Sequence, residues 1–201
     1  MASLPRKGFS RALDKFYDWL ENKAENGAVP AITGLAVENH GVGPFCKTVL
    51  KFTDVAIALV DEAGVVAYKG TKVYDFPAGA ISVLGAHADL ALTKSSAGVN
   101  ATWDGDFSLG TVTASNNATL SSTEQNLIPT TPTPQAVAGV TTAKGVATAT
   151  EAFKVLDGTA TAIDAYLNFL VDDADHDVTG TPCNLIVNGE VTIFWYNLGD
   201  V

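Results

Sequence analysis

Apolar and polar side chains alternate along residues 48–92, which is the pattern of half-buried β-strands. The alternation is clearest from Val73 to Leu84, where it stops at Pro77–Gly79 and then resumes. Proline presets φ and cannot donate a hydrogen bond to a neighbouring strand, and glycine tolerates positive φ. This tripeptide therefore predicts a corner between two strands, placed at the end or edge of a sheet.

Two further segments also show strand patterns. Residues 55–59 alternate and stop at a turn over residues 61–64. Residues 163–171 alternate more strictly than a helical period would, although a helix is an alternative there. The predicted inner face of the sheets collects seven apolar side chains from the strand patterns: Val55, Ile57, Leu59, Ile81, Val83, Leu167 and Phe169.

Turn residues separate the remaining segments. Asn188-Gly189 lies between the apolar runs Leu185–Val187 and Val191–Tyr196. Because Asn-Gly supplies the two positive φ values of a type I′ turn, this arrangement predicts a β-hairpin. Residues 130–150 are rich in threonine, alanine and proline. They are compatible with a linker or with a long loop that contains one weak edge strand.

With about eight short strands in all, the chain is expected to be mainly β, an antiparallel jelly roll or β-sandwich over residues 47–201. Residues 1–46 are expected to form an N-terminal amphipathic helix and an extended arm. Ser10 can cap this helix, and Gly27 stands where a C-cap residue would. Four large apolar side chains recur at the spacing of one helical stripe: Leu13, Phe16, Tyr17 and Leu20. The stripe either packs against the chain's own sheet or docks on a partner protein.

Composition narrows the classes of protein to consider. The chain has 201 residues, 47% of them hydrophobic, which suits one domain with its own core. No apolar run approaches the roughly 18 to 20 residues needed to cross a bilayer, so we expect no membrane partner and no ordinary export signal. A net charge of −10 argues against a nucleic-acid partner. Residues 1–30 hold five basic and four acidic side chains, so the acidic excess lies in the rest of the chain.

Histidine and cysteine, which are common metal ligands and nucleophiles, form no recognisable constellation. The three histidines, His40, His87 and His176, lack metal-ligand spacing. Cys46 and Cys183 form no Cys-x-x-Cys pair and are expected to be reduced thiols. We therefore predict a protein that is not an enzyme, with no catalytic residues, no metal and no cofactor.

Carboxylates supply the remaining candidate chemistry. The run Asp172–Asp177 has the i, i+2, i+4 spacing of a calcium-binding loop, but Val178 stands where that loop needs glycine and Asn184 where it needs glutamate. We interpret the run as a solvated acidic loop, with a weak cation site as the alternative. Asp104 and Asp106 form a carboxylate pair of the kind that glycosidases use, although facing geometry cannot be deduced from spacing.

Five segments carry a resemblance to a known family: Lys72–Gly85, Leu109–Ser115, Ala118–Leu120, Leu156–Ala160 and Val191–Asp200. Together they resemble structural proteins of tailed bacteriophages, most closely the jelly-roll decoration, or cement, proteins that bind outside an icosahedral head. The likeness covers roughly residues 47–200 and consists of turns and strand ends, so other virion components such as tail, collar or head-fibre proteins share it.

The resemblance implies a virion protein on the outer surface of the capsid, made in the host cytoplasm, with the major capsid protein as its partner. It also implies self-association as a homotrimer. The leader helix is not part of the resemblance, so its docking role rests on its apolar stripe. A carbohydrate-binding module is a more distant alternative, for which Trp103 is the loop aromatic that would contact a sugar.

Overall fold

The computed structural model describes residues 27–42, 45–61, 66–115, 119–172, 175 and 182–199. The predicted leader helix, with Leu13, Phe16, Tyr17 and Leu20, lies outside the described residues. Within them the chain is mainly β and forms two antiparallel sheets. The larger sheet contains β1 (Leu35–Val42), β2 (Phe45–Ala58), β5 (Gly79–Lys94), β8 (Val140–Val146), β9 (Lys154–Gly158) and β11 (Asn184–Gly199). The smaller sheet contains β3 (Val60–Asp61), β4 (Val66–Asp75), β6 (Gly105–Gly110), β7 (Ile128–Thr133) and β10 (Asp164–Asp172).

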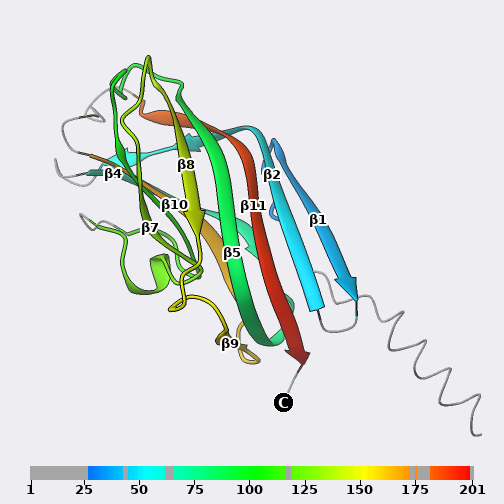
Figure 1. Ribbon diagram of the computed structural model, residues 1–201. Coiled ribbons are helices and arrows are strands. Elements are labelled where there is room, and N and C mark those ends of the chain that lie inside the picture. The colour runs from blue at the N-terminus through cyan, green and yellow to red at the C-terminus, as the bar shows by residue number, and fades with distance from the viewer. Residues whose placement is uncertain are drawn as a thin grey trace, which may run out of the picture.

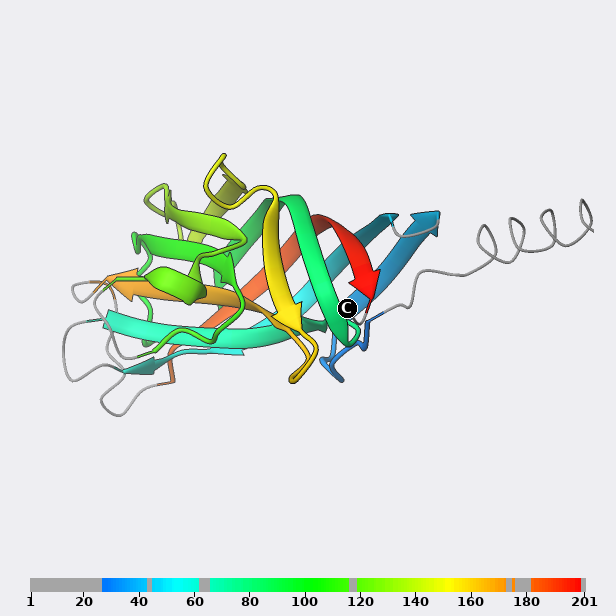
Figure 2. The same ribbon diagram turned by 90° about the horizontal axis from the view of Figure 1, so that it is seen from below.

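The two sheets pack face to face as a β-sandwich. The larger sheet has the order β1-β2-β11-β5-β8, with β9 also pairing with β5, and the smaller has the order β3-β4-β10-β6-β7. The larger sheet faces the viewer in Figure 1, and Figure 2 shows its strands crossing those of the smaller sheet at an angle. Segments far apart in sequence are therefore neighbours in both sheets, as where β11 lies between β2 and β5.

The corner predicted at Pro77–Gly79 is confirmed. It joins β4 in the smaller sheet to β5 in the larger one, so it carries the chain from one layer to the other. Gly79 has φ +109, which a side chain would strain. Beside the corner, the Phe76 amide donates to the Ile163 carbonyl at 2.8 Å.

The predicted inner face is also confirmed, because all seven of its residues are buried in the core between the sheets. Aromatic side chains fill the centre of this core. Phe76 lies edge-to-face with both Tyr74 (ring centroids 5.1 Å apart) and Trp195 (5.3 Å). Tyr74 and Phe76 come from the β4 side of the corner and Trp195 from β11, so these contacts join the two layers.

The predicted hairpin at Asn188-Gly189 is wrong. Residues 184–199 form one long strand, β11, which is hydrogen-bonded to β2 and β5 along its length. The pairing with β2 shifts register between Val187 and Gly189, where Thr53 and Asp54 of β2 together face Asn188, so β2 carries a β-bulge there. A Cβ at Gly189 would lie 2.2 Å from the Asp89 carbonyl oxygen, which shows that glycine allows a close approach of β5 there.

Other segments differ in detail from their sequence patterns. Residues 130–150 contain most of β7 and all of β8, which are terminal strands in the order of their sheets. Pro129 and Pro132 are compatible with that place, because an outer strand leaves one row of backbone groups without a ladder partner.

Within the segment expected to be an extended arm, residues 35–42 form β1. Residues 164–172 form a strand, which rules out the helical alternative there.

A buried asparagine holds the segment that follows β6 against the outer face of the smaller sheet. Asn168, on β10, is fully buried. Its Nδ2 donates to the carbonyls of Val112 (3.0 Å) and Glu124 (2.7 Å), and its Oδ1 accepts from the amide of Ala114 (2.8 Å). One side chain therefore ties three backbone groups of the covering segment to the sheet.

The Glu124 side chain closes the same segment on itself. Its Oε1 accepts from both the amide (2.9 Å) and the hydroxyl (2.7 Å) of Ser115, and its Oε2 accepts from the amide of Ser121 (2.9 Å). The carboxylate is buried, and these three hydrogen bonds replace the water it loses.

Candidate functional site

Large apolar side chains gather at one end of the larger sheet, on its outward face. Six of the eleven exposed large hydrophobic residues in the described part of the chain lie there, beside the partly exposed Tyr196. This apolar strip consists of Phe45, Val146, Phe153, Val155, Phe194, Tyr196 and Leu198. In Figure 1 the start of β2 and the end of β11, which carry Phe45 and Phe194, lie at the lower end of the sheet. Contiguous exposed apolar surface of this kind is typical of an interaction site.

Strand alternation explains why these aromatic rings point outward. Trp195 is buried in the core, so its neighbours on β11, Phe194 and Tyr196, face the other side of the sheet. Tyr196 lies opposite Phe45 on β2, with ring centroids 4.0 Å apart. The Phe194 ring lies 6.2 Å from that of His87 on β5. The strip therefore crosses β2, β11 and β5.

Open space lies next to Phe194 at Gly85. On β5, Gly85 pairs with Phe194. On the other side of β5, the pairing with β8 ends at His87 and the pairing with β9 begins at Val83, so Gly85 lies beside the connection between those strands. A Cβ built on Gly85 meets nothing within 4 Å. Glycine thus leaves open space in the middle of the strip.

Phe153 extends the strip from that connection. It is 76% exposed and has φ +59, in the left-handed region that a bulky residue rarely adopts. Such a conformation costs of order 1 kcal/mol or more. The turn is held by the Glu151 carboxylate, which accepts from both the amide and the hydroxyl of Thr148. A large apolar ring is therefore presented to solvent on a strained but well-anchored turn.

Charged side chains border the strip and balance one another. Lys51 pairs with Glu38 at 2.7 Å, and Lys144 pairs with Asp89 at 2.8 Å. A shallow groove of about 520 Å³ runs along this row and is lined by Lys51, Asp89 and Glu190 among others. The exposed or partly exposed charged side chains in and beside the strip are four lysines and four carboxylates: Lys47, Lys51, Lys144, Lys154, Glu38, Asp89, Asp157 and Glu190. The Glu151 carboxylate in the Phe153 turn is buried and is not counted among them. This surface is neutral, whereas the chain carries −10.

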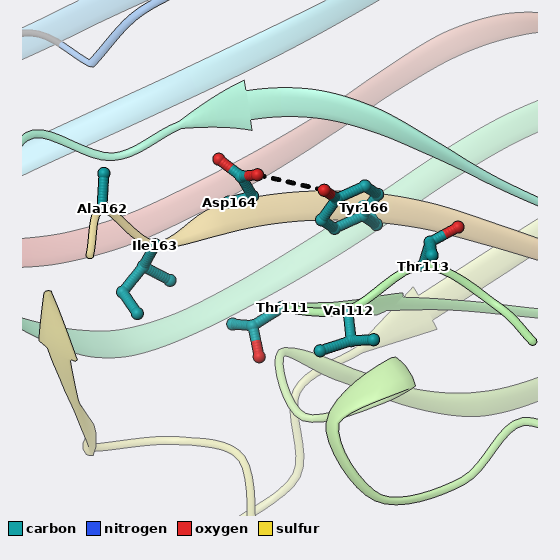
Figure 3. Close-up of a pocket in the computed structure, with 7 residues that line it drawn as sticks. All are labelled: Thr111, Val112, Thr113, Ala162, Ile163, Asp164 and Tyr166. Atoms are coloured by element: carbon teal, nitrogen blue, oxygen red, sulfur yellow. Dashed lines mark hydrogen bonds between the residues drawn. The ribbon is translucent and has the colours of Figure 1, made fainter.

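A pocket of about 310 Å³ opens on the smaller sheet (Figure 3). Asp164 and Tyr166 come from β10, and Thr111–Thr113 form the opposite wall. The Asp164 carboxylate accepts the Tyr166 hydroxyl at 3.0 Å and pairs with Lys72 at 2.6 Å. Lys72 also pairs with Asp75 at 3.1 Å, so a single lysine is shared by two carboxylates beside this pocket.

Acidic side chains come together at another place in the fold. The amide of Asp104 donates to the Asp175 carboxylate at 3.1 Å, and the amide of Asp172 donates to the Asp104 carbonyl at 3.3 Å. Burial, together with the hydrogen bond and charge of Asp175, raises the pKa of Asp104 above its ordinary value. Burial also raises the pKa of Asp106, and the charge of Asp172 adds to the effect.

These raised pKa values predict a gain in stability from Asp104→Asn at neutral pH. A carboxyl with a raised pKa binds protons more readily in the folded state, so ionisation costs stability above that pKa. The cost disappears as the pH falls through the raised folded-state pKa to below the ordinary value of 3.8. We expect Asp104→Asn to raise the melting temperature at pH 7, with a gain that shrinks toward about pH 4.

The matched control is Asp89→Asn, which removes an exposed carboxylate paired with Lys144. This variant should show no gain at pH 7. Thermal unfolding of both variants and the wild type at several pH values makes the comparison. A lower melting temperature for Asp104→Asn at pH 7 would contradict the proposed cost of ionisation.

No family model, curated protein or solved structure matches this chain. In the part of the chain that the structure describes, no group of histidine, cysteine and acidic side chains is arranged to hold a metal ion. The residues Asp173 and Asp177 of the acidic run lie outside that part. Among the described residues, no helix combines the length and apolar character needed to cross a bilayer.

The other sequence candidates are distributed over the fold. Trp103, the suggested sugar-binding aromatic, is 1% exposed and donates its Nε1 hydrogen to the Gly139 carbonyl at 3.2 Å, so that suggestion is wrong. Cys46 and Cys183 are both buried, and burial raises the pKa of the Cys46 thiol to about 11. His40 lies near Glu38 on β1, and His87 lies beside Phe194. His176 lies outside the described residues.

The apolar strip was not predicted from the sequence. A signal was present, because strict alternation through Val191–Tyr196 places Phe194 and Tyr196 on one face and Trp195 on the other. Alternation alone does not say which of those faces is covered. The strip also joins residues 45, 153 and 194, which only strand pairing brings together.

Proposed function

We propose that this chain is a virion structural protein that binds the outside of an icosahedral phage head and stabilises contacts between capsomers. The observation that carries the proposal is the apolar strip, which gathers exposed aromatic side chains at one end of a rigid β-sandwich. A shell protein needs such a stiff body with surfaces for protein contacts. The resemblance to jelly-roll decoration proteins supports the same assignment and implies a homotrimer.

The described part of the chain begins, at Gly27, near the end of the sandwich that carries the strip. The amide of Gly27 donates to the Tyr74 hydroxyl at 2.8 Å, and that hydroxyl donates to Asn39 Oδ1 at 3.1 Å. The Tyr74 ring lies 6.4 Å from that of Trp195, which is flanked in β11 by two residues of the strip. Gly27, the first described residue, therefore lies close to the apolar end of the sandwich.

We assign head binding to the leader. Its stripe of Leu13, Phe16, Tyr17 and Leu20 would lie on the major capsid protein, and burying four such side chains contributes roughly 6 to 10 kcal/mol before ordering costs. Several leaders attached to one oligomer would bind a symmetric shell with avidity, because each later contact forms at high effective concentration.

The test uses heads that lack the protein. We expect the full-length chain to bind them, and the full-length double variant Phe16→Ser, Leu20→Ser to bind at least about tenfold more weakly, because about half of the stripe is lost. The matched control is Asp14→Ser, Asp18→Ser, which changes the same segment off the stripe and should bind like the wild type. Cosedimentation with heads measures all three.

The number of copies of the protein in purified virions tests its location directly. Quantitative proteomics of purified virions should find tens to hundreds of copies, as a repeated position on a symmetric shell requires. A handful of copies would instead assign the protein to the collar, tail or a head fibre. Absence from particles would overturn the proposal.

The exposed rings of the strip also favour a second candidate, a carbohydrate-binding module, because sugars stack on planar aromatics. Phe45, Phe194 and Tyr196 would supply such a platform on the sheet surface. Binding of soluble glycans, weakened by Phe194→Ala, would support this candidate. Failure of glycans to bind at millimolar concentration would remove it.

A further inference from the structure

We propose that the apolar strip is the surface through which this chain binds a second copy of itself. The proposal goes beyond head binding, since it concerns association in solution and does not depend on where the protein is finally located. It rests on the extent of the strip, its charge and the conformation of Phe153.

The size of the surface suits a stable interface. At the strip the sheet is five strands wide, from β1 across β2, β11 and β5 to β8 or β9. Because neighbouring strands lie about 4.8 Å apart, these five strands are roughly 24 Å across. About eight residues along a strand, at about 3.3 Å each, make this end of the sheet roughly 26 Å long. This end of the sheet, which includes the polar border on β1 as well as the strip, is then about 600 Å² before the relief of the side chains is added, compared with roughly 800 Å² per partner in a standard interface.

Electrostatics favours a second copy as the occupant. Two chains that each carry −10 repel one another when their acidic surfaces approach. The strip and its border are neutral, with four lysines and four carboxylates. Lysines of one copy can therefore lie near carboxylates of the other, while the apolar side chains meet between them.

Phe153 has the properties of an interface anchor. It is held at φ +59 with 76% of its surface exposed, so in the isolated chain the strained backbone gains no compensating burial of the ring. Strain of this kind persists where a functional contact uses it. Buried aromatic anchors dominate the affinity of many protein interfaces. Contact with a second copy would bury this ring.

Gly85 gives the sharpest test, because a side chain there alters the surface without disturbing the fold. A Cβ at this position meets nothing within 4 Å, and the outward-facing Phe194 pairs with it across the sheet. In Gly85→Lys, a long charged side chain would project from the middle of the strip. The control Val112→Lys adds the same side chain at an exposed position on the segment that covers the smaller sheet.

Sedimentation of the full chain without heads measures association. We expect the wild type and Val112→Lys to be oligomeric at about 100 µM, where a micromolar complex is nearly complete. Gly85→Lys should raise the dissociation constant at least about 30-fold, the loss typical of a disrupted hot spot. Its secondary structure should match that of the wild type. Phe153→Ser, which removes only an exposed ring, should also weaken association.

Three results would overturn the proposal: a monomeric wild type, an oligomer that Gly85→Lys and Phe153→Ser leave intact, or equal disruption by Val112→Lys. If the wild type is monomeric and Gly85→Lys loses binding to heads, the strip belongs to the capsid contact instead. If the wild type associates through the strip but does not bind heads, the self-association stands and the proposed function fails.

Discussion

Replacing Asn168 by alanine is expected to lower the free energy of unfolding by roughly 2 to 4 kcal/mol. The side chain is fully buried and hydrogen-bonds the carbonyls of Val112 and Glu124 and the amide of Ala114. The Glu124 carbonyl keeps the Ser108 hydroxyl as a donor at 2.6 Å. Removing the asparagine therefore takes this partner from two backbone groups, the Val112 carbonyl and the Ala114 amide, and each such group costs roughly 1 to 3 kcal/mol. The estimate stays at the lower part of that sum because the covering segment can move and admit water.

Asn188→Ala is the matched control. Asn188 also makes two side-chain hydrogen bonds, with the amide and the carboxylate of Asp54, but both are exposed. Water replaces them, so the expected loss is about 1 kcal/mol or less. Urea unfolding of both variants at pH 7 gives the comparison. Equal losses for Asn168→Ala and Asn188→Ala would show that the buried network does not hold the segment on the sheet.

Leu167→Ala is expected to cost roughly 2 to 5 kcal/mol, because it leaves a cavity between the two sheets. Leu167 is 1% exposed and belongs to the main core. For a domain of this size, each kcal/mol corresponds to roughly 2 to 4 °C, so the melting temperature should fall by roughly 5 to 20 °C.

The same substitution at Leu198, which is 50% exposed at the end of β11, serves as the control. It removes little buried surface from the single chain and should lower the melting temperature by less than about 3 °C. Calorimetry of the two variants under identical conditions measures the difference. A Leu167→Ala variant as stable as Leu198→Ala would mean that the two sheets do not pack through this face.

Local sequence patterns were sufficient for much of the architecture. Period-two alternation identified Val55, Ile57 and Leu59 on one side of β2 and its end, and Leu167 and Phe169 on one side of β10, and all five are buried. Proline and glycine identified the corner before β5. These features depend on backbone preferences and on the strict alternation of side chains along a strand, which are properties of a few adjacent residues.

Strand pairing decided what the patterns could not. Asn188-Gly189 has the composition of a hairpin turn, yet β2 and β5 both continue past it, so the chain remains extended and the irregularity is a bulge in β2 opposite Asn188. The Thr- and Pro-rich segment pairs as edge strands because neighbouring strands provide partners there. A local signal for a turn or a linker yields to hydrogen bonds supplied by distant parts of the chain.

For the apolar strip, too, the sequence predicted one part and the tertiary structure decided the rest. Sequence alone predicted a β-rich chain with alternating faces. The rule that side chains alternate along a strand also implies that Phe194 and Tyr196 lie on the face opposite Trp195, although this was not used to predict a site. Only the tertiary structure decided that this face is uncovered, that Phe45 and Phe153 join it, and that Trp103 is buried. The physical reason is that alternation specifies which side chains share a face, whereas exposure depends on which other segments of the chain pack against that face.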